Sequence, residues 1–123
     1  MASPHEKLVI IASTGLDDER TSVTWSVANG GIASGLDVTV FLVASGADIV
    51  RKGAIAHARM NPLDPPVKDM VENFMESGGK VIVCPPCAKV RGYEPEDMID
   101  GIEVAGSPAV HALIKEGAAT LCF

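Results

Sequence analysis

The chain has 123 residues and a formal net charge of −6, and 47% of its residues are hydrophobic while only 4% are aromatic. A chain of this length fits one domain with an aliphatic core, which we place at residues 1–123, and its acidic balance argues against nucleic acid or anionic membranes as main partners. Because no apolar run has the length of a membrane span and the polar N-terminal segment has no secretory apolar region, we expect a cytoplasmic protein.

Short, uninterrupted apolar runs recur along the chain. Runs of this kind are typical of strands that are buried on both faces, as in a parallel sheet. The predicted strands are residues 7–13, 37–44, 80–84 and 118–123, with a shorter one at 101–104.

The first predicted helix begins after three acidic residues at 17–19 and reaches about Ser34. Acidic side chains at this position favour a helix N-terminus. Gly30 and Gly31 weaken the helix locally and would permit close packing on the sheet.

Two further helices are marked by proline near the start and glycine after the end. One follows the Asp-Pro-Pro run at 64–66, and its apolar stripe extends from Val67 to Met75. The other takes Ser107 as its N-cap and Pro108 as its first residue, and it ends at Gly117.

The alternation of strands and helices predicts right-handed βαβ units. The expected fold class is therefore α/β, a three-layer α/β/α sandwich with a mostly parallel sheet of about five strands. Residues 53–66 form the loosest segment, which we expect to be a loop near the functional site.

The segment 80–93 points to a chemistry, because a strand-like run delivers Cys84 and Cys87 to the start of a short predicted helix. Ligands of open α/β sheets bind where strands end and helices begin. Backbone amides and the helix dipole would favour the thiolate of Cys84 there. Arg91 would add a positive charge on the same face, and Gly92 would end the helix.

Three cysteines are an odd number, which argues against a disulfide framework. Only one closely spaced pair is present, so we predict no zinc site, no other metal and no cofactor. The plain alternative is that Cys84 packs as a small hydrophobic side chain at a strand end. Cys122, in the last predicted strand, is expected to be buried.

Ser13 and Thr14 follow the first predicted strand and should lie at the same edge of the sheet. They are candidates for hydrogen bonding to a substrate or anion, with loop structure as the alternative explanation. Tyr93 is a candidate for lining the pocket.

Two histidines and one arginine outside this motif have simpler explanations. His57 and Arg59, in the loose segment, would either fold over the site as a lid or be ordinary surface residues. His111 is expected on the surface of the last helix or at an interface.

A strand that ends in Cys84 and a helix that closes with Arg91-Gly92 resemble the DsrE/DsrF-like (YchN-like, TusD-like) sulfur-relay family. The resemblance extends over nearly the whole chain. It implies a DsrE/F-like fold and a persulfide carried on Cys84. It also implies sulfur donor and acceptor proteins as partners, and a homo-oligomer, either a trimer or a hexamer.

The leading hypothesis is a sulfur carrier or sulfurtransferase-like protein that uses Cys84. Cys87 is not a general feature of the relay family, and it could resolve a persulfide by forming a disulfide with Cys84. The alternatives are a thiol-disulfide redox protein that uses both thiols and a non-enzymatic oligomeric binding module.

Overall fold

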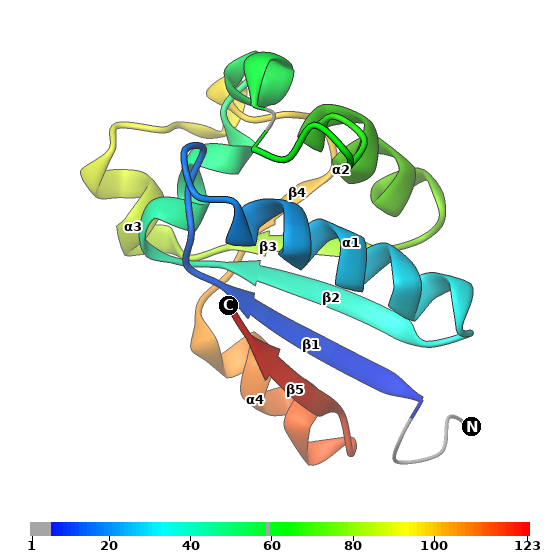
Figure 1. Cartoon of the computed structure of the whole chain (residues 1–123). Coiled ribbons are helices and arrows are strands. Elements are labelled where there is room, and N and C mark those ends of the chain that lie inside the picture. Colours follow the sequence, from blue (N-terminus) through cyan, green and yellow to red (C-terminus); the bar gives the residue numbers. More distant parts are fainter. Residues whose placement is uncertain (1–5, 59) are drawn as a thin grey trace.

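A five-stranded sheet forms the centre of the computed structural model, which describes residues 6–58 and 60–123, without the side chain of His57 (Figure 1). The strands lie in the order β4-β3-β2-β1-β5, and every neighbouring pair is parallel. This confirms the predicted α/β class and the mostly parallel sheet. The strands are β1 (Lys7–Ala12), β2 (Asp37–Leu42), β3 (Lys80–Val83), β4 (Ile102–Val104) and β5 (Ala119–Cys122).

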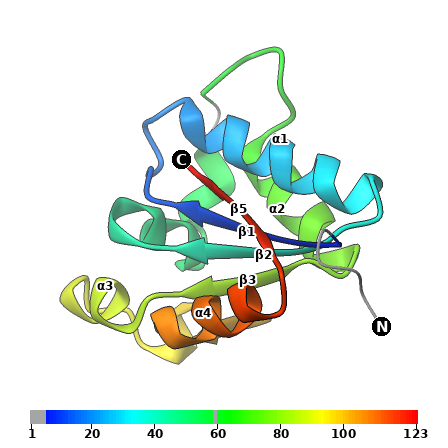
Figure 2. The same ribbon diagram turned by 90° about the horizontal axis from the view of Figure 1, so that it is seen from below.

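Helices cover both faces of this sheet (Figure 2). Because β1, β2, β3 and β4 follow one another across the sheet, right-handed crossovers place the first two connecting helices on one face, whereas the short helix after β3 lies beyond the strand ends (Figure 1). The return to β5, beside β1, places α4 on the opposite face. The helices are α1 (Arg20–Ala33), α2 (Val67–Glu76), α3 (Pro85–Val90) and α4 (Ser107–Lys115).

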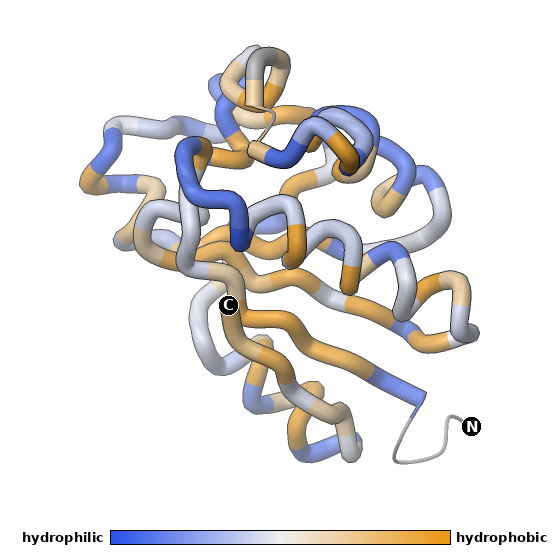
Figure 3. The backbone as a smooth tube through the Cα atoms, in the orientation of Figure 1, coloured by the Kyte–Doolittle hydropathy of each residue, from blue (hydrophilic) through white to orange (hydrophobic). Residues whose placement is uncertain are grey.

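Strand residues alternate between two hydrophobic clusters, as the two-residue period of a strand requires. Ile10 and Val40 face α1 and α2, where Trp25 and Phe74 make an edge-to-face contact with ring centroids 5.6 Å apart. On the α4 side, a smaller cluster consists of Val9, Phe41, Ile82 and Val110. Figure 3 shows hydrophobic residues along the central strands and polar residues along the outer turns.

The close approach predicted for the glycine pair is found at Gly31. A Cβ added there would lie 2.8 Å from Cγ2 of Val38, whereas one added at Gly30 would meet nothing within 4 Å. Gly31 therefore lets α1 lie directly on β2.

Helix starts lie close to the prediction. The first helix begins at Arg20, directly after the three acidic residues as expected, and the Asp18 side chain accepts a hydrogen bond from the Arg20 amide at 2.9 Å. The last helix takes Gly106, rather than Ser107, as its N-cap, because the amide of Ala109 already bonds to the carbonyl of Gly106 at 3.1 Å.

Three short 3-10 helices occur within the described residues, between the longer elements. They are η1 (Ala44–Val50), η2 (Ala54–His57) and η3 (Pro95–Asp97). The segment 53–66 is therefore partly ordered by η2, and the amide of Val67 bonds to the carbonyl of Ala58 at 3.2 Å. None of the described helices is long and apolar enough to cross a membrane.

Candidate functional site

Cys84 lies directly after β3 and forms the N-cap of α3, at the edge of the sheet where the strands end. Its amide donates a hydrogen bond to the carbonyl of Leu42 on β2 at 3.0 Å, and its carbonyl accepts one from Ala88 at 3.1 Å. Two backbone bonds therefore fix the position from which its thiol emerges. The helix begins at Pro85 even though Pro86 follows.

The Cys84 thiol is half-buried and packs against the cluster on the α4 side of the sheet. Burial is the largest influence on its pKa and raises it above the ordinary value. The Cys87 amide acts in the opposite direction, although the thiol forms no capping hydrogen bond of normal geometry. The Cys87 side chain raises the pKa further. The amide at the helix start therefore favours the Cys84 thiolate, as predicted, but burial outweighs it and the pKa is raised in the resting protein.

Cys87 lies one turn along α3 and packs against the cluster on the α1 and α2 side. Its sulfur accepts a hydrogen bond from the amide of Ala44, at a distance of 3.2 Å. Ala44 has a φ of 49°, in the left-handed region that non-glycine residues rarely adopt. A strained residue at the end of β2 thus aims its N–H at the second thiol, a feature that the sequence did not reveal.

The strain at Ala44 gives a first prediction. Replacing Ala44 with glycine should raise the free energy of unfolding by about 0.5–1 kcal/mol, since relief of the left-handed strain outweighs the extra chain entropy of glycine. Urea denaturation of the wild type and Ala44→Gly tests this. A loss of stability would show that the Ala44 conformation is not strained.

Arg91 is engaged within the chain. Its Nη1 donates to the carbonyl of Cys87 at 3.1 Å, and its Nε lies 3.3 Å from a carboxylate oxygen of Asp48 in η1. Tyr93 donates its hydroxyl to the same carboxylate at 2.6 Å, and this bond raises the pKa of the tyrosine. Asp48 therefore ties the end of α3 to η1, a role that sequence reasoning missed.

Ser13 and Thr14 follow β1 at the same edge, but β2 lies between them and Cys84. The hydroxyl of Ser13 donates to the carbonyl of Phe123 at 2.7 Å. Thr14 is buried, and its hydroxyl lies 2.9 Å from that of Thr21. Both hydroxyls have partners within the chain, so a role in substrate binding stays a prediction.

Cys122 was expected to be buried, and this is wrong. It lies exposed on β5, the outermost strand on its side of the sheet, because no helix covers that strand fully. His111 is exposed on α4, as expected. Arg59 and the side chain of His57 lie outside the described residues.

Two cavities flank α3. One, of about 220 Å³, is lined by residues that include Pro85, Ala88 and Tyr93. The other, of about 250 Å³, is polar and is lined by residues that include Arg51 and Arg91. Neither cavity is lined by a thiol. Within residues 6–58 and 60–123, no group of three or more potential metal-binding side chains is assembled.

The raised pKa of Cys84 predicts its alkylation profile. In a Cys122→Ser background, the rate of Cys84 alkylation by iodoacetamide should rise with pH through a midpoint above about 8.5, the value for an unperturbed thiol. Adding Cys87→Ser should lower that midpoint only in part, because burial is the larger cause. Peptide mass spectrometry at each pH gives the rate, and a midpoint below 8 would contradict this account of the site.

Comparison with known proteins identifies close matches across the chain. A model of the DsrE/DsrF-like family matches residues 6–123. The uncharacterized protein MJ0989 of Methanocaldococcus jannaschii is 30% identical over 116 residues, which cover 94% of this chain and 96% of that protein. The uncharacterized protein MJ0760 of the same organism is 31% identical over 84% of this chain, but the match spans only 38% of that longer protein.

Among solved structures, the YchN protein of E. coli superposes with a TM-score of 0.76 at 22% identity. The superposition covers 96% of this chain and 99% of the YchN chain. At this level of identity, the likeness shows a shared fold.

Proposed function

Because the chain belongs to the DsrE/DsrF-like family, we propose that it is a small sulfur carrier or sulfurtransferase-like protein that holds a persulfide on Cys84. The observation that supports this most is the position of the thiol. Cys84 caps α3 at the end of β3, half-buried, with a second thiol as its neighbour. That position combines a fixed backbone with partial shielding from water.

Loading begins when the Cys84 thiolate attacks the outer sulfur of a donor protein's persulfide. The donor's S–S bond breaks, the donor cysteine leaves as a thiolate that takes up a proton, and a new S–S bond joins Cys84 to the transferred sulfur. Delivery repeats these steps with an acceptor thiolate as the attacking group and Cys84 as the leaving group. The sulfane sulfur moves without net oxidation or reduction, so neither step needs an external oxidant or reductant.

The electrostatics of Cys84 suit a carrier that is inert until a donor docks. Burial against the cluster of Val9, Phe41, Ile82 and Val110 favours the neutral thiol in the resting protein. In the loaded form, the negative charge lies on the outer sulfur, one atom further from this apolar surface. The desolvation cost of the anion is therefore smaller in the persulfide than in the thiolate.

A thiol-disulfide redox activity is the second candidate. It is favoured because the Cys87 side chain raises the pKa of Cys84, which means that the two thiols lie close enough to interact. Attack of the Cys87 thiolate on the inner sulfur of the Cys84 persulfide would form a Cys84–Cys87 disulfide and release hydrosulfide. Disulfide formation in glutathione buffers, measured by thiol titration, distinguishes this role. Two thiols that never couple would exclude it.

We propose a supporting role for Arg91 and Tyr93 and keep Ser13 and Thr14 as predicted substrate-binding residues. Arg91 and Tyr93 share Asp48 as their partner, so their first effect is on the position of α3. Arg91 and Tyr93 would contact the anionic end of a donor only if docking of that donor displaced Asp48.

The proposal is tested by incubating the full chain with a persulfide donor and measuring its intact mass. A gain of about 32 Da that dithiothreitol reverses is expected, since one sulfur atom adds to one thiol. No gain at any donor concentration would overturn the proposal. A non-enzymatic binding module would then be the better interpretation. In that case a Cys84→Ser/Cys87→Ser variant should keep the biological function of the protein.

We further propose that the chain forms a homo-oligomer, a trimer or hexamer, in the cytoplasm, where its three free thiols would stay reduced. Leu121 on β5 and Ile114 on α4 are each 42% exposed, and β5 is an outermost strand with no charged residue. Unprotected edges of this kind favour association.

Replacing Leu121 with lysine should therefore weaken the oligomer. Multi-angle light scattering after gel filtration should give a smaller mass for Leu121→Lys than for the wild type, because a charge opposes burial of the edge. Leu63→Lys, at an exposed loop residue, is the matched control and should leave the mass unchanged. A monomeric wild type at high micromolar concentration would contradict the oligomer.

A further inference from the structure

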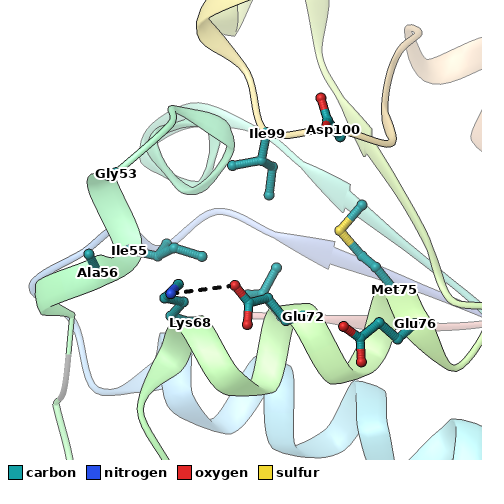
Figure 4. Close-up of a pocket in the computed structure, with 10 residues that line it drawn as sticks. Gly53, Ile55, Ala56, Lys68, Glu72, Met75, Glu76, Ile99 and Asp100 are labelled. Atoms are coloured by element: carbon teal, nitrogen blue, oxygen red, sulfur yellow. Dashed lines mark ion pairs between the residues drawn. The ribbon is translucent and has the colours of Figure 1, made fainter.

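A cavity of about 290 Å³ lies apart from the two thiols, between η2, α2 and the segment that leads into β4. Figure 4 shows Ile55, Met75 and Ile99 pointing into this common space from the three elements. Val71 of α2 completes the lining with a fully buried side chain. The interior of the cavity is therefore apolar.

The walls of this cavity are held by the backbone. The amide of Ile99 donates to the carbonyl of Val50 at 2.8 Å, and the amide of Lys52 donates to the carbonyl of Asp97 at the same distance. These two bonds hold the segment that carries Ile99 against the chain that leads to η2. The cavity is thus preformed and does not depend on loop closure.

The rim of the cavity is acidic. Glu72, Glu76 and Asp100 line it together with a single lysine, Lys68. Lys68 pairs with Glu72 at 3.7 Å, as the dashed line in Figure 4 shows. Glu76 and Asp100 make no ion pair within the described part of the chain. The rim therefore carries more negative than positive charge, and among the described residues Glu76 and Asp100 have no ion-pair partner.

We propose that this cavity is a second binding site, for small organic amines with an apolar body and a protonated amino group. The apolar body would replace water against Ile55, Val71 and Ile99, and the ammonium would lie at the mouth, in the negative field of the rim carboxylates, which include Glu76 and Asp100 on opposite sides (Figure 4). The charge at the mouth repels persulfides and other sulfur anions, so this ligand is distinct from the sulfur substrate. The volume lies at the lower end of the range for small-molecule sites, which fits a compact amine.

Binding is tested with 4-phenylbutylamine as the probe, beside 4-phenylbutan-1-ol and 4-phenylbutyrate, which carry the same apolar body. Methyl resonances of Ile55, Val71, Met75 and Ile99 in the full chain report occupancy of the cavity. The amine should bind most tightly, the alcohol about fivefold more weakly, and the carboxylate most weakly. The three probes differ mainly in the charge of the end group, and a charge interaction at an exposed rim is weak.

The variant Glu76→Gln/Asp100→Asn should reduce amine affinity to that of the alcohol and leave alcohol affinity unchanged. Glu6→Gln/Glu103→Gln, with the same change in net charge at other exposed positions, is the control and should leave amine affinity unchanged. Ala56→Leu, at an exposed residue that lines the cavity, should weaken both the amine and the alcohol.

Equal affinity for amine and carboxylate would overturn the proposal, as would shifts scattered over the surface. If Ala56→Leu perturbs folding, the two carboxylate variants still test the proposal, because they change only exposed side chains. Cys84→Ser should bind the amine as the wild type does, so the outcome is independent of sulfur transfer.

Discussion

A Cys84→Ser variant is expected to lose persulfide loading completely, with no mass gain above background at any donor concentration. Serine keeps the size of the side chain but cannot form a stable S–S bond with the transferred sulfur. The backbone bonds of residue 84 to Leu42 and Ala88 remain available, so the fold should be kept. The measurement is intact mass spectrometry after incubation with a persulfide donor.

Cys87→Ser is the matched control, because it removes a thiol from the same helix. This variant should load sulfur on Cys84 at a rate within about threefold of the wild type. It should also hold the persulfide longer, since attack by a neighbouring thiolate on the inner sulfur is no longer available. Loss of loading in Cys87→Ser with retention in Cys84→Ser would reverse the assignment of the carrier.

A Gly46→Ala variant is expected to lower the free energy of unfolding by about 2–3 kcal/mol, the upper part of the range for inserting a group into a tightly packed site. A Cβ at residue 46 would lie 2.3 Å from the carbonyl oxygen of Ala12, and backbone cannot give way as a flexible side chain can. The η1 segment would have to shift, which would disturb the bond from Ala44 to Cys87. Urea denaturation measures the loss.

Gly30→Ala is the control for the stability measurement, because an added Cβ there meets nothing within 4 Å. It should raise the free energy of unfolding by about 0.5–1 kcal/mol, since alanine is the better helix former. Equal effects at the two positions would show that the close contact of Gly46 with Ala12 does not determine stability.

The sheet and its helices could be predicted because their signals are local. Each buried strand appears in the sequence as a continuous apolar run, and glycine marks the ends of α3 and α4, where Gly92 and Gly117 have φ values of 76° and 94°. The position of Cys84 as a helix cap followed from its place between an apolar run and two prolines.

The electrostatic environment of the site could not be predicted from the sequence, because it depends on contacts between segments that are distant in the chain. Asp48, which binds Arg91 and Tyr93, lies more than forty positions before them in the sequence. The burial that raises the pKa of Cys84 comes from the cluster on the α4 side. The amide of Cys87 lowers the pKa, as the position at the helix start predicted, but it has a smaller effect than burial.

The exposure of Cys122 was missed for a related reason. An apolar run predicts a strand, but it does not show whether helices cover both faces of that strand. In this fold, β5 is the last strand added beside β1, and its residues remain exposed. The same apolar exposure supports the proposal of an oligomer.

The most direct test of the central claim is to locate the transferred sulfur on the chain. After loading, alkylation of the wild type and proteolysis would separate peptides that contain residues 84 and 87 from the peptide that contains residue 122. Fragment spectra should place an additional sulfur of about 32 Da on Cys84 alone. Sulfur found on Cys87 or Cys122, with Cys84 unmodified, would contradict the account.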